Sequence, residues 1–293
     1  MKLYEELSPH KIANRINKAA DALGVQRENM QLLFRLQELL RQIGESRYKD
    51  DFIFKGGFEL TTVLGAPLRT TTDLDATLNN HDLTPDNLKE VLTEIFDHAQ
   101  SPIHFTVTRV KPEMNANHYP GFRVGVIGTM GKTSSKLNID ISTGDTIYPE
   151  PIQFSHTNFI DPDDKIMVKA FPLEQVMADK LLTIYQKGSR NTGAKDFYDI
   201  WVLSVMGSVN LDQLKLTSAF KETAKTKQIT DLTLDNGEAI IEALRMEPNM
   251  TRSWQSYQTS MEFAHEIELN QVLNKARDQL RTIFKTFKNT VSE

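Results

Sequence analysis

The stretch from Lys55 to Asp75, KGGFELTTVLGAPLRTTTDLD, joins a double glycine to an Asp-x-Asp pair. A short apolar run ends at Lys55, and Gly56 and Gly57 follow it directly. One interpretation is a strand-to-helix turn that needs a positive φ, followed by a capped loop. The other is a phosphate site, because glycine lets backbone N–H groups approach an anion and a following helix adds its positive end, to which Lys55 would add charge.

The two aspartates favour the second interpretation when they are taken together with the glycines. Residues two apart on a strand point to the same side, so Asp73 and Asp75 would lie side by side while Leu74 is buried on the other face. Carboxylates this close repel each other unless a cation lies between them. Mg²⁺ prefers oxygen ligands and leaves room for substrate phosphates. A capped turn with a solvated second aspartate is the alternative.

The composition is that of a globular protein and excludes several other classes. Of 293 residues, 39% are hydrophobic and 25% are charged, which is enough to build a core. The absence of cysteine excludes disulfides and cysteine-based zinc sites, and we expect a cytoplasmic protein with no membrane segment. A net charge of -5 argues against a protein that coats nucleic acid through bulk positive charge, although a local patch could still bind RNA.

Hydrophobic periodicity predicts an α+β fold whose sheet lies in the first half of the chain. Two amphipathic helices are expected first, and a capped helix follows the Asp-x-Asp strand. Alternating apolar and polar residues predict half-buried strands after that helix. These helices are expected over 9–23, 27–44, 58–65 and 84–99, and the strands over 51–55, 71–79, 103–110, 122–128 and 136–142.

The second half of the chain is expected to be almost entirely helical after Pro162. We place the boundary in the proline- and aspartate-rich segment 151–165, which predicts one domain over 1–160 and a helical domain over 161–293. The expected helices span 172–188, 194–207, 211–225 and 236–246, with a last long one from 269 to 287.

A third carboxylate is available on the strand 136–142. Asp140 has the phase of the polar face, opposite Ile139 and Ile141, so it would either join Asp73 and Asp75 or face water. Asp145 lies in the segment STGD, which is typical of a turn.

A second cluster of charges lies in the helical half. Lys180 shares a partly apolar helix face, where a lysine either extends its ammonium group to water or is held by an acid. Asp196 and Asp199 are three residues apart and would project to one side of a helix. The alternative is that Asp196 caps that helix and Asp199 pairs with Lys195.

These motifs, in this order, resemble the AbiEii/AbiGii nucleotidyltransferase toxin family. The resemblance covers roughly 52–203 and rests on four groups of residues. They are KGGxxL, then R-x-T-x-D-L-D with Arg69, Thr71, Asp73 and Asp75, then DKL at 179–181, then Arg190 with the K-D-x-x-D of Lys195, Asp196 and Asp199.

The resemblance implies a polymerase-β-like nucleotidyltransferase core joined to a C-terminal helical bundle. It implies that Asp73 and Asp75 bind Mg²⁺ with an NTP, and that Arg69, Thr71 and Lys180 contact the nucleotide. It further implies that Lys180 and Asp196 complete the active site across the domain cleft with Asp199 in support. It also implies a bacterial abortive-infection toxin that acts against phage, has a winged-helix antitoxin encoded by a neighbouring gene, and transfers NMP to the 3′ end of tRNA.

Two departures from the family pattern bear on how phosphates would be held. Many nucleotidyltransferases have Gly-Ser where this chain has Gly56-Gly57, and Phe58 stands where a small hydroxyl residue is common. Backbone N–H groups are therefore expected to make the phosphate contacts. Nucleotidylation of a protein and a non-catalytic module that binds nucleotide or a partner stay open as alternatives, as does the oligomeric state.

Overall fold

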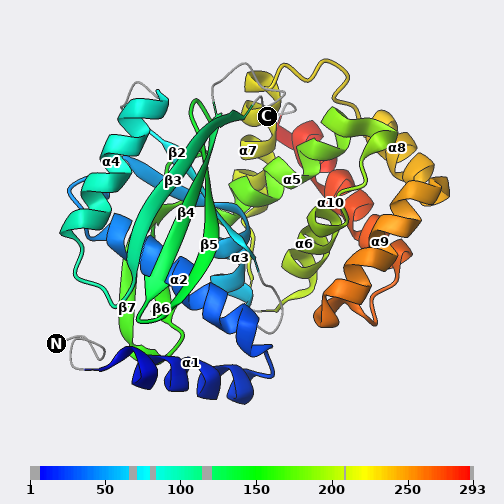
Figure 1. The fold of residues 1–293 in the computed structure, drawn as a ribbon. Helices are drawn as coiled ribbons and strands as arrows, with labels where there is room; N and C mark the ends of the chain where they lie inside the picture. The colour runs from blue at the N-terminus through cyan, green and yellow to red at the C-terminus, as the bar shows by residue number, and fades with distance from the viewer. Residues whose placement is uncertain (1–6, 66–70, 80–83, 114–120, 208, 291–293) are drawn as a thin grey trace. The chain divides into compact units, whose positions relative to one another are not determined.

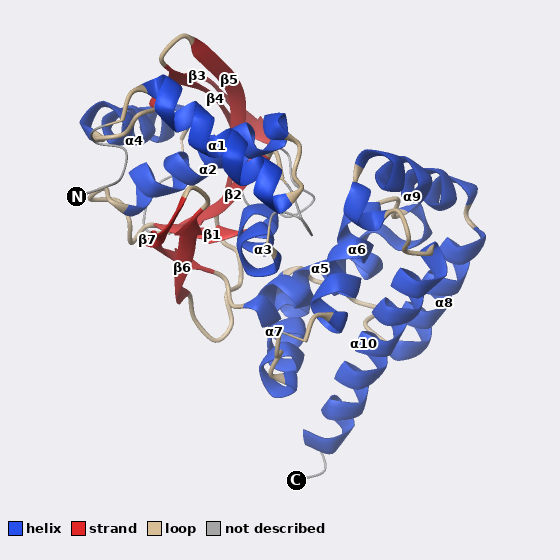
Figure 2. Cartoon of the chain, turned by 90° about the horizontal axis from the view of Figure 1, so that it is seen from below, coloured by secondary structure: helices blue, strands red, loops and turns tan. Residues whose placement is uncertain are grey.

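The computed structural model describes residues 7–65, 71–79, 84–113, 121–207 and 209–290, which form two compact units. The first unit comprises Met1–Asp145 and Pro151–Phe171, and the second comprises Thr146–Glu150 and Pro172–Glu293. The first unit is mixed α+β and the second is helical, as Figure 2 shows by colour. The predicted α+β fold with a C-terminal helical region is therefore confirmed.

A seven-stranded mixed sheet forms the centre of the first unit, with the order β3-β4-β5-β2-β1-β7-β6 (Figure 1). Strand β2 lies in the middle of this order, where it pairs parallel with β5 and antiparallel with β1, and β1 pairs parallel with β7. The strands are β1 Phe52–Lys55, β2 Asp73–Leu78, β3 His104–Glu113, β4 Gly121–Met130, β5 Thr133–Ser142, β6 Ile152–Asn158 and β7 Asp161–Ala170.

The strand register divides the middle of this sheet into an apolar face and a polar face. Leu74 on β2 pairs with Ile139 on β5, and Ile139 pairs with Val124 on β4. These three side chains are 0% exposed. Because side chains alternate along a strand, the residues on either side of Leu74 point to the opposite face. Core packing of one face therefore fixes the direction of Asp73 and Asp75.

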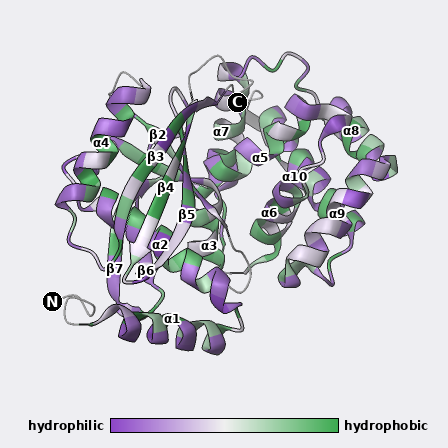
Figure 3. Ribbon diagram, in the orientation of Figure 1, coloured by the Kyte–Doolittle hydropathy of each residue, from purple (hydrophilic) through white to green (hydrophobic). Residues whose placement is uncertain are grey.

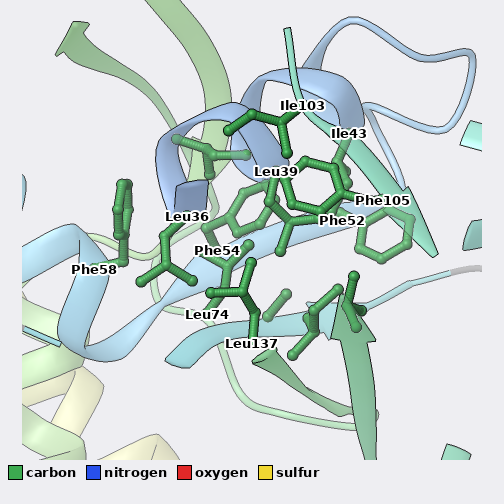
Figure 4. Packing of buried hydrophobic residues seen from close by; sticks show 14 of the residues in the cluster. Leu36, Leu39, Ile43, Phe52, Phe54, Phe58, Leu74, Ile103, Phe105 and Leu137 are labelled. Atoms are coloured by element: carbon green, nitrogen blue, oxygen red, sulfur yellow. The ribbon is translucent and has the colours of Figure 1, made fainter. Parts of the chain in front are cut away.

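Helix α2, Arg27–Gly44, covers the apolar face, and Figure 4 shows its residues Leu36, Leu39 and Ile43 packed against Phe52 and other strand residues. The other helices of this unit are α1 Pro9–Leu23, α3 Gly56–Leu64 and α4 Pro85–His98. Ser8 and Thr84 cap α1 and α4 through bonds to backbone N–H groups, with a proline at the helix start. Hydrophilic and hydrophobic residues alternate along α1 in Figure 3, as expected for a helix with one buried face.

The segment expected to link two domains is instead a hairpin of the sheet. Strands β6 and β7 pair antiparallel from Ile152 and Ala170 onward, and β7 adds to β1. The helical expectation for the residues just after Pro162 is therefore wrong, because 163–170 continue β7. The units divide between Phe171 and Pro172, whereas the sequence placed the boundary at 160/161.

The second unit is built from helices packed around a separate core. Phe220 on α7 lies 6.1 Å from Phe284 and 6.4 Å from Phe287 of α10, between ring centroids. In the part of the chain that the structure describes, no helix is long and apolar enough to span a bilayer. The helices are α5 Leu173–Lys187, η1 Gly188–Arg190, α6 Ala194–Val205, α7 Gln213–Thr226, α8 Leu234–Met246, α9 Pro248–Ser260, η2 Glu262–Ala264 and α10 Leu269–Thr290.

Candidate active site

Four charged residues form a row across the polar face of the sheet. Lys55 on β1 pairs with Asp75 on β2, Asp75 pairs with Asp140 on β5, and Asp140 pairs with Arg123 on β4. Directly paired residues share a face, so the row carries a cation, two carboxylates and a second cation. Asp73 lies two residues before Asp75 on the same face of β2, beside Asn138 of β5. The sheet thus gathers three carboxylates from two parallel strands.

The double glycine lies directly beside this row. Gly56 has a φ of 76°, and a Cβ at this position would collide with the carboxylate of Asp75. Only glycine therefore fits both the left-handed backbone and the close approach. Gly57 donates its backbone N–H to Asp75 Oδ2 at 3.4 Å, and α3 begins at Gly56, two residues before the expected start. The N-terminal turn of a helix thus lies against one of the two carboxylates.

Local hydrogen bonds fix the conformation around Asp73. The side-chain amide of Asn138 donates to Asp73 Oδ1 at 3.1 Å, and the hydroxyl of Thr72 donates to Oδ2 at 3.2 Å. Thr71 is buried, and its hydroxyl donates to the backbone oxygen of Asp73 at 3.3 Å. The predicted nucleotide-binding role of Thr71 stays a prediction, while its position supports Asp73. Arg69, predicted to bind nucleotide, lies outside the described residues.

Lys55 is held by a carboxylate that the sequence suggested only as a turn residue. Its Nζ lies 2.6 Å from Asp145 Oδ2 and donates to Ser142 Oγ at 2.7 Å. The hydroxyl of Thr77 also bonds Asp145. Burial alone raises the pKa of Asp145, but the Lys55 ammonium and the hydrogen bonds outweigh it and lower the pKa. In the structure, Lys55 is thus anchored beside the turn by an ionised partner.

The carboxylate of Asp140 forms an ion pair with Arg123 of the neighbouring strand β4. Arg123 Nε and Nη2 donate to the two oxygens of Asp140 at 2.8 and 2.7 Å, and these bonds raise the pKa of the guanidinium. In the described part of the chain, no group of three or more histidine, cysteine, aspartate or glutamate side chains is arranged to hold a metal ion. Asp73 and Asp75 still fit Mg²⁺, which proteins bind through one or two carboxylates together with substrate phosphates. The metal-ligand role of Asp140 stays a prediction.

The second unit contains its own cluster of charges. Lys180 Nζ lies 3.0 Å from Asp196 Oδ1 and 2.7 Å from Asp199 Oδ2, and the side chain of Asp199 is 0% exposed. Lys180 is thus held by acids, as one of the two alternatives proposed. Asp196 lies in the first turn of α6, whose N-cap is Gly193. Whether this cluster and the carboxylates of the first unit share one site stays a prediction.

The sequence analysis missed several residues that shape the first cluster. Asn138 and Arg123 contact predicted carboxylates from neighbouring strands, and their polar phase within β5 and β4 was the available signal. Glu59 is 2% exposed on α3, and neither side-chain oxygen has a hydrogen-bond partner among the residues that the structure describes. Burial raises its pKa well above the usual value. The sequence around Glu59 did not predict that its side chain is buried.

Residues 38–282 match the family model for the nucleotidyl transferase AbiEii toxin of type IV toxin–antitoxin systems. The chain belongs to the AbiEii family. The resemblance recognised from the motifs is confirmed over a longer range than they spanned, and the chain is a nucleotidyltransferase. Membership among AbiEii toxins also implies an antitoxin partner.

The other comparisons are more distant than the AbiEii match. JHP933 from Helicobacter pylori is 14% identical with a TM-score of 0.48, over 91% of this chain and 96% of its own. An antigenic nucleotidyltransferase-like protein from Paracoccidioides brasiliensis is 18% identical with a TM-score of 0.39, over 73% of this chain and 93% of its own. No curated protein matches the chain.

Proposed function

We propose that this AbiEii protein is a Mg²⁺-dependent toxin that transfers NMP from an NTP to the 3′ end of tRNA in the cytoplasm. The observation that carries the proposal is the placement of Asp73 and Asp75 on one face of β2, with Asp75 against the Gly56–Gly57 turn. Two adjacent carboxylates suit a divalent ion that arrives with phosphates. A neighbouring winged-helix antitoxin is part of the same proposal.

In this reaction, the 3′ hydroxyl oxygen attacks the α-phosphorus, the bond to the β-phosphate bridging oxygen breaks, and pyrophosphate leaves. A divalent ion held by Asp73 and Asp75 supplies charge neutralisation on the phosphates. The backbone N–H groups at the start of α3 are suited to bind an anionic oxygen. We assign Lys180 a contact to the triphosphate, and Asp196 either orients Lys180 or accepts the proton of the hydroxyl.

The test is transfer from each α-³²P-labelled NTP, with and without Mg²⁺, into purified tRNA and into a cell lysate. We expect label in tRNA, no label with EDTA, and no label in tRNA whose 3′ diol has been oxidised with periodate. Label in protein instead of RNA would redirect the proposal to protein nucleotidylation. No label with any NTP would favour a non-catalytic binding module.

Two variants connect this activity to the carboxylates. Asp75→Asn removes one charge from the pair, so we expect transfer to fall at least a hundredfold. Asp163→Asn is the matched control, because Asp163 is an exposed aspartate on β7 of the same unit. Expression in bacteria should be toxic for the Asp163 variant and harmless for the Asp75 variant. Equal activity of the two variants contradicts the site assignment.

A further inference from the structure

His156 on β6 makes a hydrogen bond through each of its ring nitrogens, and the residue is 0% exposed. Nε2 lies 3.1 Å from Gln37 Oε1, and Nδ1 lies 2.7 Å from the hydroxyl of Thr62. The backbone N–H of Phe159 also donates to Gln37 Oε1, so this oxygen is an acceptor. In a neutral imidazole, Nε2 then carries the proton and Nδ1 accepts from the Thr62 hydroxyl, whose oxygen also lies 3.1 Å from the backbone oxygen of Phe58 within α3.

The same ring packs against one aromatic side chain on α3 and one in the turn between β6 and β7. Its centroid lies 5.1 Å from that of Phe58 and 4.9 Å from that of Phe159. Phe58 and Thr62 are four residues apart and thus lie on one face of α3. Gln37 belongs to α2. His156 therefore contacts α3 through the ring of Phe58 and through the hydroxyl of Thr62. It connects that helix to α2, through Gln37, and to its own strand β6.

This tie acts on the helix that starts at the double glycine. Gly57 lies one residue before Phe58, and its N–H points to Asp75 Oδ2. The hydroxyl of Thr61 bonds the backbone oxygen of Gly57 at 2.8 Å, so the first turns of α3 are joined internally. A rotation or shift of α3 would therefore move the N–H groups at its start relative to the carboxylates.

We propose that His156 is a positioning residue for nucleotidyl transfer: through Thr62 and Phe58 it fixes α3 so that the Gly56–Gly57 turn faces Asp75. The inference rests on the proposed function, and it assigns His156 no contact with substrate. Misplacement of a reacting geometry by about 1 Å costs up to a hundredfold in rate, so a small movement of α3 is enough to be measured.

Three variants test the contact. His156→Phe keeps a ring between Phe58 and Phe159 but loses both hydrogen bonds. Thr62→Val changes the shape little and removes the hydroxyl, together with its contact to the backbone oxygen of Phe58. His156→Gln is the conservative variant, because an amide supplies one donor and one acceptor. Thr108→Val is the matched control in the same unit, since it removes a 2.9 Å hydrogen bond between β3 and β4.

Rates are measured at a temperature at which every variant is folded, together with hydrogen exchange of peptides that cover α3. We expect His156→Phe and Thr62→Val to lower kcat about tenfold with little change in KM for the NTP, and to speed exchange in α3. His156→Gln should recover most of kcat, and Thr108→Val should match the wild type. The double variant of His156 and Thr62 should lose less than the two single losses combined, because the two side chains share one contact.

The inference is overturned if the folded Thr62→Val and His156→Phe proteins keep the wild-type kcat, or if Thr108→Val loses as much. Should His156→Phe fail to fold, Thr62→Val carries the test alone. Should the wild type transfer no nucleotide at all, the proposed function fails separately. Exchange in α3 then decides the positioning role, which is refuted by equal protection in the Thr62 and Thr108 variants.

Discussion

Mild acid is expected to destabilise the first unit through His156. Burial is the main cause of its low pKa, about 3 against the ordinary 6.5; Arg41 and Lys165 lower it further, and Asp164 opposes them. Below pH 6.5 the unfolded chain therefore binds a proton that the folded chain rejects until about pH 3, so stability is lost as pH falls through this window. At pH 5, 1.5 units below 6.5, the loss is about 2 kcal/mol at ~1.4 kcal/mol per unit.

The assay compares the wild type with His156→Gln in urea at pH 7 and pH 5. Other titrating groups, including Glu59, are common to both proteins and cancel in the difference. Unfolding of the first unit is measured by hydrogen exchange of peptides from β1 and β5. The two tryptophans, Trp201 and Trp254, both lie in the second unit, so their fluorescence gives an internal control.

We expect the free energy of unfolding of the first unit to fall about 2 kcal/mol more in the wild type than in the variant between these pH values. The fluorescence transition should respond to pH equally in the two proteins. An equal response of the first unit in both proteins would refute the assignment of a neutral, buried imidazole.

Three further predictions concern single side chains. Gly56→Ala should abolish transfer, because the new Cβ would meet the carboxylate of Asp75. The control Gly24→Ala has a φ of 66° and open space around it, so it should lose only ~1–2 kcal/mol of stability and keep its activity. Transfer by the Gly56→Ala protein would contradict this prediction. Glu59→Gln should stabilise the first unit increasingly above pH 4.5, by up to ~1.4 kcal/mol per pH unit, because the folded wild type holds a proton that its unfolded state releases. Hydrogen exchange in urea at pH 5 and pH 8 measures this gain in stability. An equal gain at both pH values is inconsistent with a protonated, buried Glu59. Lys180→Met should cost the second unit about 3–5 kcal/mol, because the fully buried Asp199 loses a cation; an unchanged fluorescence midpoint in urea would count against this.

The sequence predicted the strands and helices wherever a period of 2 or 3.6 was clear. The phase of Asp-Leu-Asp predicted that Leu74 is buried and that Asp73 and Asp75 share the other face, because alternation along a strand is local geometry. The β6–β7 hairpin was missed because the prolines and aspartates of 151–165 are typical of a linker. Pairing of β7 with β1 joins residues more than a hundred positions apart, and no local pattern shows it.

The candidate site could be predicted only for residues that lie close together in the sequence. Gly56, Gly57, Asp73 and Asp75 come from one stretch, and their proximity follows from a strand, a turn and a neighbouring strand. The partners of Asp140 and Lys55 depend on register and on a turn, so Arg123 and Asp145 could not be assigned in advance. His156 gave no signal, because a lone histidine on a strand is usually only part of a core.

The late position of β6 and β7 in the chain has a consequence for synthesis. When β1 and β2 leave the ribosome, β1 has one unpaired edge, and its partner at Lys169–Ala170 is still untranslated. At about 5–20 residues per second, the wait is several seconds or more. The imidazole that steadies α3 is made in the same late segment. A nascent toxin molecule therefore carries its carboxylates well before the sheet around them is complete. Activity has to wait until β7, and after it Lys180 and Asp196 of the second unit, have been made.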